Sequence, residues 1–269
     1  MGKALYLIVS GMLATSLAIC IWVFSGPGNQ EWNNEGLVDV PRLNFRPLPD
    51  DKKSTLIQLK LSNKTNHLKW TENLMSFLDK YYDPRKIGKG IENMYACSYN
   101  THLPPKGKFC DVLVDTMELG PCIRDNYFGY HKGSPCVFLK LNMINGWVPE
   151  YYNEPNDLPE VMPEQLKYHI RYNVTPIERK TIWISCEGEN PADVEFMGPV
   201  QFYPSTQGLP YYYFPYDKTE GYMSPLVAVQ FKRPTTGVVI NIECKAWAKN
   251  IKHNREDESG MVHFQLLVD

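Results

Sequence analysis

The uncharged run from Ala4 to Phe24 limits what this chain of 269 residues can be. It holds 21 consecutive residues without a charge, and about 20 apolar residues let a helix cross a bilayer core of roughly 30 Å. A cleaved signal peptide has an apolar stretch of only about 7–15 residues. The sequence therefore predicts a retained transmembrane helix over residues 4–24 that contacts membrane lipid, with cleavage after Ser25-Gly26 as the alternative.

The charges around this run predict its orientation. Lys3 precedes it, and the next basic residue is Arg42. Because positive charge stays on the cytoplasmic side, residues 1–3 are expected to form a very short cytoplasmic tail, and the rest to lie outside the plasma membrane as a single-pass type II protein. The mean hydropathy of −0.37 excludes several spans, and a net charge of −2 argues against a nucleic-acid partner.

The seven cysteines fit this topology. Cys20 lies inside the span, and an even number remains for an oxidising compartment: Cys97, Cys110, Cys122, Cys136, Cys186 and Cys244. Spacing alone leaves fifteen possible connectivities open for six cysteines. Because no pair has Cys-x-x-Cys spacing and no histidine pair has ligand spacing, neither a metal nor another cofactor is expected.

Two N-x-[S/T] sequons also agree with an extracellular location. They are Asn63-Lys64-Thr65 and Asn173-Val174-Thr175, and both asparagines are candidate glycosylation sites. Pro176 follows the second sequon, so Asn173 is expected to be the poorer acceptor.

Composition and periodicity predict how the extracellular part is organised. Residues 25–66 are interpreted as a stalk, because their first half is rich in Gly, Pro and Asn. Residues 67–269 are predicted to form one domain, which begins with a helix over 67–82. Apolar residues recur there at helical spacing, Asn66 is the expected cap, and Pro84 ends the helix.

The rest of the domain favours β-structure. Strand patterns occur over 181–186, 226–231, 238–248 and 262–268, and the last two alternate apolar with polar residues. These patterns predict an immunoglobulin-like antiparallel β-sandwich with one or two helices. Such a sandwich needs only about 100 residues, so long insertions are required, and the proline-rich segment 145–166 is one candidate. Cys186 and Cys244 both lie in predicted strands and suit an inter-strand bridge.

Catalytic motifs are not found in the sequence. It contains no phosphate-binding glycine loop, no G-x-S-x-G and no H-E-x-x-H. The six histidines are scattered singly, and Glu187 and Glu189 are better explained as solvated carboxylates than as an acid–base pair. The dense aromatic run at 211–216, Tyr-Tyr-Tyr-Phe-Pro-Tyr, has two interpretations of equal weight: a protein interface, or a sheet edge packed under the domain's own loops.

Several long motifs, in order, resemble the β-subunit family of the Na,K-ATPase and H,K-ATPase ion pumps, over residues 36–269. They are Gly36-Leu37, Phe45-Arg46-Pro47, Phe128-Gly129-Tyr130, the segment 133–142, Cys186-Glu187-Gly188-Glu189, the segments 212–216 and 224–231, Cys244-Lys245-Ala246 and Asn250-Ile251.

This resemblance implies the function and several roles. It implies the disulfides Cys97–Cys110, Cys122–Cys136 and Cys186–Cys244, and an immunoglobulin-like sandwich. It also implies a non-catalytic subunit that binds the catalytic α subunit, supports its folding and delivery, and modulates K⁺ affinity. The residues expected to contact α are Tyr6, Gly11, Tyr212, Tyr213, Phe214, Pro215 and Tyr216.

The chain departs from the family at its N-terminal end. Only residues 1–3 precede the span, whereas family members usually carry a longer tail. Val9 and Ser10 stand where an aromatic pair is usual. The alternatives are therefore a β-like surface glycoprotein or adhesion module that acts without a pump, and an H⁺/K⁺ pump subunit. An ectoenzyme is the weakest hypothesis.

Overall fold

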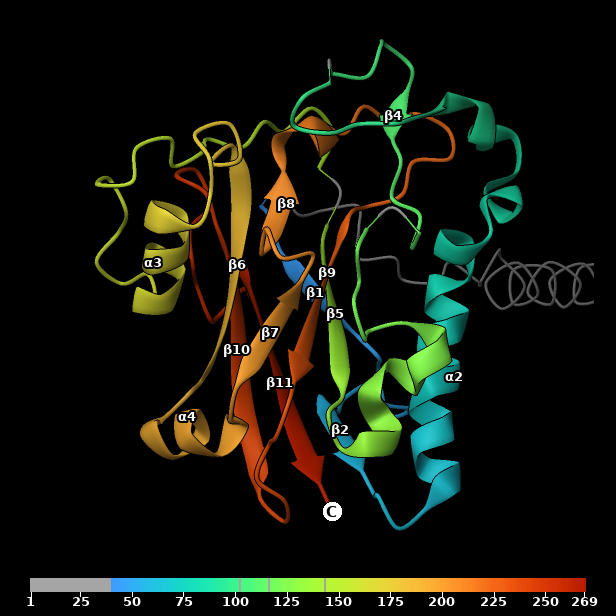
Figure 1. Ribbon diagram of the computed structural model, residues 1–269, viewed down its shortest axis with the longest axis vertical. Coiled ribbons are helices and arrows are strands. Elements are labelled where there is room, and N and C mark those ends of the chain that lie inside the picture. Colours follow the sequence, from blue (N-terminus) through green and yellow to red (C-terminus); the bar gives the residue numbers. More distant parts are fainter. Residues whose placement is uncertain (1–39, 102, 116, 143) are drawn as a thin grey trace, which may run out of the picture. The chain divides into compact units, whose positions relative to one another are not determined.

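Two β-sheets, joined face to face by buried side chains, form the centre of the domain in the computed structural model (Figure 1). The structure describes residues 40–101, 103–115, 117–142 and 144–269. One sheet has the order β1 (Leu43–Arg46), β5 (Cys136–Leu141), β9 (Leu226–Phe231) and β7 (Val200–Tyr203). The other has the order β2 (Leu56–Leu59), β11 (Met261–Val268), β10 (Val239–Trp247), β6 (Thr181–Gly188) and β8 (Gly208–Pro210).

Aromatic rings join the two sheets. The ring of Phe264 in β11 stacks on Phe45 in β1 at 5.1 Å between centroids, and it meets Phe231 in β9 edge-on at 6.1 Å. In β10, Ile240, Ile242 and Cys244 are fully buried, whereas the residues between them are half-buried on the other face. The predicted alternation over 238–248 is therefore confirmed, and it gives this strand one core face and one wet face.

Two of the predictions need correction at the N-terminal side of the domain. β1 and β2 both lie within the segment 25–66 that was expected to be a stalk, and each adds an edge strand to a sheet. β2 also runs parallel to β11, with Leu266 opposite Ile57, so the sandwich is not wholly antiparallel. Strands of four residues are too short to show a period in the sequence, although they bury apolar side chains such as Leu59 in the core.

The first described helix, α2 (Lys64–Tyr82), also begins earlier than predicted. Asn63 is its cap, because its side-chain oxygen accepts a hydrogen bond from the Thr65 N–H at 3.0 Å. Asn66 was the wrong choice, since its side chain instead accepts from the Lys60 N–H at 2.7 Å. The helix ends at Tyr82, as predicted, just before Pro84. A short 3₁₀ segment, η2 (Pro84–Asn93), follows.

With α3 (Glu164–Tyr172) and α4 (Pro191–Met197), the described residues contain three α-helices, whereas one or two were predicted. α3 begins within the proline-rich segment 145–166, which was one candidate for an insertion. It buries Leu166 and Ile170 against Trp183 and Trp247 in a second small core on the side of the domain away from α2 (Figure 1). α4 (Pro191–Met197) is too short for a periodic signal, and it depends on Asn190 as its cap.

The segment between α2 and β5 is an insertion whose last part packs against β5 of the four-stranded sheet. It contains β3 (Met94–Tyr95), β4 (Phe109–Cys110) and the 3₁₀ segment η3 (Arg124–Lys132). Phe128 of η3 meets Phe138 of β5 edge-on at 5.9 Å, and both are fully buried. Gly129 has φ +77°, and a Cβ there would lie 2.0 Å from the Ser134 carbonyl oxygen. Only glycine fits this turn.

The three disulfides are Cys97–Cys110, Cys122–Cys136 and Cys186–Cys244. This is the connectivity that the family resemblance implies, and it is confirmed. Cys186 and Cys244 lie directly opposite each other in the β6–β10 register, so the predicted inter-strand bridge is confirmed as well.

The predicted tail and transmembrane helix, with Tyr6, Gly11 and Cys20, lie outside the described residues. Across the segments of 40–269 that the structure describes, no helix combines the length and the apolar character that a membrane crossing requires.

Candidate partner-binding site

The aromatic segment, residues 211–216, follows the edge strand β8 and is fixed at both ends. Its first three residues form the 3₁₀ turn η4 (Tyr211–Tyr213). The Tyr211 N–H donates to the Lys180 carbonyl at 2.9 Å, and the Tyr216 carbonyl accepts from the Gly146 N–H at 2.8 Å. Backbone bonds to two distant loops therefore position a segment that has little regular structure of its own.

The rings of the aromatic segment pack against other aromatic rings of the domain. Tyr99 meets Tyr212 edge-on at 5.4 Å, Trp147 meets Phe214 edge-on at 5.9 Å, and Tyr222 lies 4.7 Å from Tyr216. Edge-to-face pairs of this kind each contribute about 0.5–1.5 kcal/mol beyond the burial of their area. These contacts hold the rings in fixed orientations.

The aromatic segment is nevertheless partly exposed. Tyr211, Tyr212, Tyr213, Phe214 and Tyr216 are half-buried, and Pro215 is exposed. The two interpretations of the sequence are thus compatible, because one side of the segment packs under the domain's own loops and the other side stays accessible.

The phenols of the aromatic segment are neutral at physiological pH, because the ordinary pKa of tyrosine, near 10, already lies well above it, and burial moves the pKa further in the same direction. Burial raises the pKa of Tyr212, and it raises the pKa of Tyr213 well above the usual value near 10. Both hydroxyls therefore remain protonated at physiological pH and can donate hydrogen bonds. Tyr213 already does so, to the Asp111 carbonyl at 3.3 Å.

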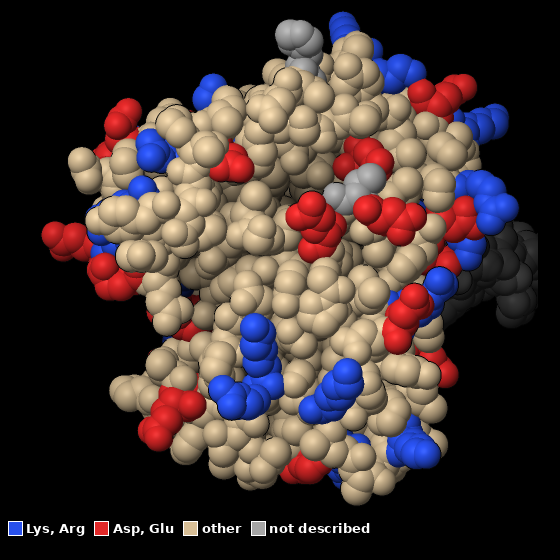
Figure 2. Space-filling view, in the orientation of Figure 1, with Lys and Arg blue, Asp and Glu red and all other residues tan. Residues whose placement is uncertain are grey.

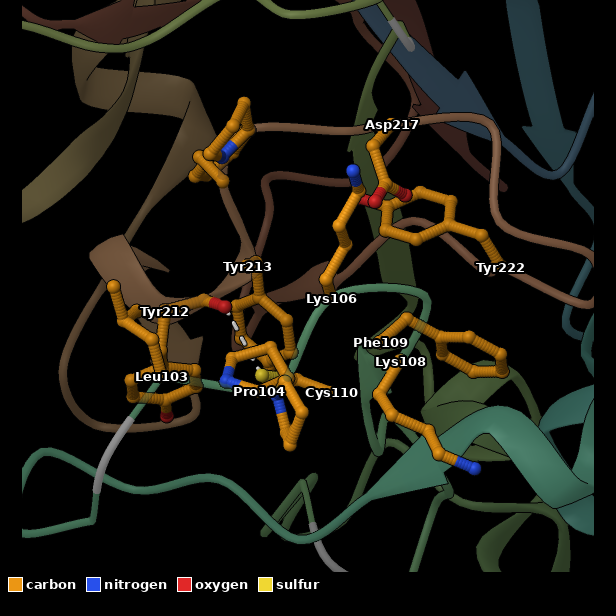
Figure 3. Close-up of a pocket in the computed structure, with 13 residues that line it drawn as sticks. Leu103, Pro104, Lys106, Lys108, Phe109, Cys110, Tyr212, Tyr213, Asp217 and Tyr222 are labelled. Atoms are coloured by element: carbon orange, nitrogen blue, oxygen red, sulfur yellow. Dashed lines mark hydrogen bonds between the residues drawn. The ribbon is translucent and has the colours of Figure 1, made fainter.

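The Cys97–Cys110 disulfide lies directly beneath the aromatic segment. The Cys110 sulfur is 3.0 Å from the Tyr212 carbonyl oxygen, the contact that is dashed in Figure 3. A disulfide sulfur carries no proton, so this is a close polar contact and not a hydrogen bond. The bridge therefore connects the loop 97–110 to the back of η4.

Two shallow hollows flank the aromatic segment, and Tyr212 and Tyr213 line both. The first, of about 150 Å³, is called the lysine-side hollow (Figure 3). Its other lining residues include Pro104, Lys106, Lys108, Phe109, Cys110 and Asp217. The second, of about 240 Å³, is called the glutamate-side hollow, and its lining includes Cys97, Tyr99, Met117, Glu118, Pro204 and Pro210.

Sequence reasoning missed several residues that complete this surface. Tyr99, Trp147 and Lys106 come from loops far from residue 211 in the chain, and no local pattern connects them to it. The only signal was the concentration of tyrosine and proline in these loops, which does not specify a contact.

Both candidate glycosylation sites are exposed, and they differ in local geometry. In the first sequon, the Thr65 hydroxyl donates to the Asn63 side chain at 2.6 Å. In the second, Asn173 is the C-cap of α3, and the Thr175 hydroxyl donates to Glu178 at 2.7 Å.

Glu189 takes part in a surface ion-pair network, and Glu187 lies next to it in the sheet. Glu189 Oε1 is 2.5 Å from His263 Nδ1, and Arg255 pairs with Glu243 at 2.8 Å. Burial raises the pKa of Glu187; the charge of Lys245 opposes this shift, and Glu243, directly opposite in the sheet register, adds to it.

These observations define a disulfide-stapled, mainly-β domain that presents a broad aromatic surface. The model of the sodium/potassium ATPase beta chain family matches residues 3–264. The chain is 47% identical to "Sodium/potassium-transporting ATPase subunit beta-2" of Drosophila melanogaster, over 98% of this chain and 83% of that protein. It is 37% identical to the beta-1 subunit of the same organism, over 85% and 71% of the two chains.

A more distant relative extends the similarity. "Probable sodium/potassium-transporting ATPase subunit beta-3" of Caenorhabditis briggsae is 27% identical, over 98% of this chain and 77% of that protein. The chain therefore belongs to the sodium/potassium ATPase beta chain family.

Proposed function

We propose that this protein is the non-catalytic β subunit of a P-type Na⁺/K⁺-transporting ATPase. It binds the catalytic α subunit, supports its folding and delivery to the plasma membrane, and modulates its affinity for K⁺. The observation that carries this proposal is the similarity to sodium/potassium-transporting ATPase β subunits, which spans 98% of the chain in the Drosophila beta-2 comparison.

The proposal includes a topology. Residues 4–24 anchor the chain in the membrane as a type II span, and Tyr6 and Gly11 on that span contact α. Residues 1–3 are cytoplasmic, and the remainder is an extracellular domain of the immunoglobulin-like type. Asn63 carries a glycan, and Asn173 is the second acceptor.

The aromatic segment is the proposed contact with α outside the membrane. Tyrosine gives a large contact area with only two rotatable side-chain bonds, so little conformational entropy is lost when a partner binds. The edge-on contacts of Tyr212 and Phe214 already restrict these rings before binding. A preorganised surface of this kind lowers the free-energy cost of association.

Co-expression with a Na,K-ATPase α chain tests the proposal. The full chain is expected to co-purify with α and to raise ouabain-sensitive pump current at the cell surface. Failure to co-purify with any Na,K-ATPase α chain would reject the proposal. A preference for an H,K-ATPase α chain in the same assay would reassign the protein to the H⁺/K⁺ pump.

A matched pair of variants tests the aromatic segment within that assay. Tyr212→Ala with Phe214→Ala is expected to reduce the amount of α recovered. Tyr168→Ala with Tyr172→Ala is the control, because these rings are 60% and 70% exposed on α3, away from the aromatic segment. Equal recovery of α with both double variants would contradict the assigned contact.

A further inference from the structure

Five exposed basic residues meet at the end of the sandwich where β2 and β11 finish. They come from three separate segments: the turn between β2 and α2, the end of η3, and the residues that follow β9. They are called the basic row, and they are Lys60, Lys64, Lys132, Lys232 and Arg233. Their positions in the chain are far apart, so the fold alone brings them together.

The turn after β2 joins the first two parts of the row. The Lys60 N–H donates to the Asn66 side chain at 2.7 Å, so this turn lies against the first turn of α2, where Lys64 begins the helix. The next residue, Leu61, contacts the end of η3, because a Cβ on Gly133 would lie 3.2 Å from the Leu61 side chain. The β2–α2 turn is therefore a direct neighbour of the residues at the end of η3.

The end of η3 also contacts the residues after β9. The Ser134 hydroxyl donates to the Lys232 carbonyl at 2.6 Å, and the Phe231 N–H donates to the Pro135 carbonyl at 3.1 Å. Lys132 therefore lies between the β2–α2 turn on one side and the residues after β9 on the other. The five cations are spread along the surface and do not converge on one point.

The charges of the basic row are not neutralised by the domain itself. Among the residues that the structure describes, none of the five has a carboxylate partner. The Lys132 ammonium contacts the neutral amide oxygen of Asn126 at 3.3 Å, and the Lys232 ammonium contacts that of Gln201 at 3.4 Å. The whole chain has a net charge of −2, so this positive surface is a local feature and not the result of a basic composition.

Two neighbouring residues describe the electrostatic surroundings of the row. The Asp269 side chain lies at the same end of the sandwich, and it accepts from the Gln58 amide at 3.0 Å. Burial lowers the pKa of His131, and the nearby charges of Lys132 and His67 lower it further. The field at the end of η3 is therefore positive.

The space-filling view agrees with this assignment. On the face drawn in Figure 2, acidic side chains gather around the central hollow, whereas lysine and arginine side chains gather on the lower half. Figure 1 shows β2 and the start of α2 in that lower part of the view. The separation of the two signs over one face favours an anionic partner at the lower end.

We propose that the basic row binds a sulfated glycosaminoglycan, an acidic polysaccharide of cell surfaces and extracellular matrix. Sulfate groups repeat along such a polymer, so one chain contacts several spaced cations, and Arg233 can donate two N–H groups to one sulfate. Counterions released from a polyanion favour binding even on an exposed surface. This role goes beyond the proposed function: it requires the extracellular location proposed above, but not the binding of α.

Binding of the full chain to immobilised heparin, a sulfated glycosaminoglycan, tests the proposal. The chain is purified in a non-ionic detergent and its N-linked glycans are removed enzymatically, because the candidate acceptor Asn63 adjoins Lys64. It is expected to bind heparin at about 0.15 M salt, and the affinity should fall steeply as salt is raised.

Removal of single charges is expected to weaken this binding. Lys132→Ala and Arg233→Ala should each lower the affinity by roughly threefold or more, and the double variant by roughly tenfold, with a shallower dependence on salt because fewer counterions are released. Lys132→Arg keeps the charge and should bind normally. All of these variants are expected to recover α as the unmodified chain does, which reports that they fold.

Two control variants remove exposed cations at the far ends of the same elements. Lys252 follows β10, whereas Lys232 and Arg233 precede it, and Lys89 lies beyond the end of α2, whereas Lys64 begins that helix. A strand of nine residues and a helix of 19 each span roughly 30 Å. Lys252→Ala and Lys89→Ala are therefore expected to leave heparin binding unchanged.

Several outcomes would overturn the proposal without affecting the proposed function, because heparin binding does not involve α. They are failure of the unmodified chain to bind heparin at about 0.15 M salt, and equal losses in the row variants and the control variants. Equal affinity for hyaluronan, which has carboxylates but no sulfate, would reject the sulfated class. Binding to phosphatidylserine vesicles but not to heparin would assign the row to a membrane surface instead. A joint loss of α recovery and heparin binding would show a folding defect and reject the assignment of that residue.

Discussion

Two regions of this molecule each contain a disulfide, and they differ in the burial of its cysteines and in the length of the strands beside it. Cys186–Cys244 joins β6 to β10, which are paired over six residue positions, and both sulfurs are buried. Cys97–Cys110 lies in the insertion, where the neighbouring strands β3 and β4 have only two residues each, and Cys97 is partly exposed. The first region is part of the packed core. The second is a surface insertion with few backbone pairings, so its disulfide is an important constraint on its conformation.

Loop length alone does not explain the difference between these bridges. They link residues 58 and 13 positions apart. The chain-entropy model gives about 4 and about 3 kcal/mol for loops of these sizes. The consequences of breaking each bridge therefore depend on what surrounds it. The core bridge stabilises the fold, whereas the insertion bridge positions the aromatic segment.

The largest effect is expected for Cys186→Ser. It removes about 4 kcal/mol of loop constraint and leaves an unpaired thiol and a hydroxyl in a buried site. That is a large share of the stability of a typical domain. The variant is expected to misfold and α to fail to mature, measured as the surface level of both chains. Normal surface levels would show that the sandwich does not depend on this bridge.

The double change Cys97→Ser with Cys110→Ser is expected to cost less stability than Cys186→Ser. The loss of α binding is expected to be comparable. The stability cost is at most about 3 kcal/mol. The sandwich strands should remain, because none of them contains either residue. Cys110 lies in β4, which pairs only with β3 in a separate two-stranded sheet. Recovery of α, normalised to folded β subunit, is expected to fall. If α recovery falls only in proportion to folded protein, the bridge has no positioning role.

Gly90→Ala sharpens the comparison further. A Cβ at Gly90 would lie 2.3 Å from the Gly221 Cα, so the loop that carries Tyr222 must move. Overpacking of this kind costs about 1–3 kcal/mol. We expect a lower free energy of unfolding in urea and reduced recovery of α. Gly88→Ala is the control, because nothing lies within 4 Å of its Cβ and only its φ of +71° is strained. An equal effect on α recovery from both variants would contradict the role of this contact.

The smallest expected effect is a dependence of stability on pH near neutrality. Burial lowers the pKa of His253 and of His169 below the unfolded value near 6.5. The unfolded chain therefore binds protons more readily, so stability is complete above about pH 6.5 and decreases as pH falls. The Tm is expected to be lower at pH 5.5 than at pH 7.5 by no more than a few degrees. A His253→Gln variant should show a weaker pH dependence, and an unchanged slope would exclude this histidine.

Periodic segments were the most predictable part of the fold. The strands β10 and β11 were predicted to within a residue or so, because burial of one strand face leaves a period of two in the sequence. The strand β9 was predicted with its observed bounds from a short apolar run, which agrees with its burial on both faces. β1, β2 and α4 were missed or misjudged because each is short, and a few residues carry no measurable period. The helix cap is Asn63 and not the predicted Asn66, because the helix begins about one turn before the first residue of the apolar pattern.

The sequence by itself determined the family, the three disulfide partnerships that the resemblance implied, and the aromatic segment as a notable surface. These features could be predicted because they depend on which residues are present and on their order along the chain. Only the tertiary structure decided that the aromatic segment is partly covered, that Cys97–Cys110 lies against it, and that two hollows share Tyr212 and Tyr213 as lining residues. Those facts depend on contacts between loops that are distant in the chain and come together only when the sandwich folds. Local sequence patterns do not predict such contacts.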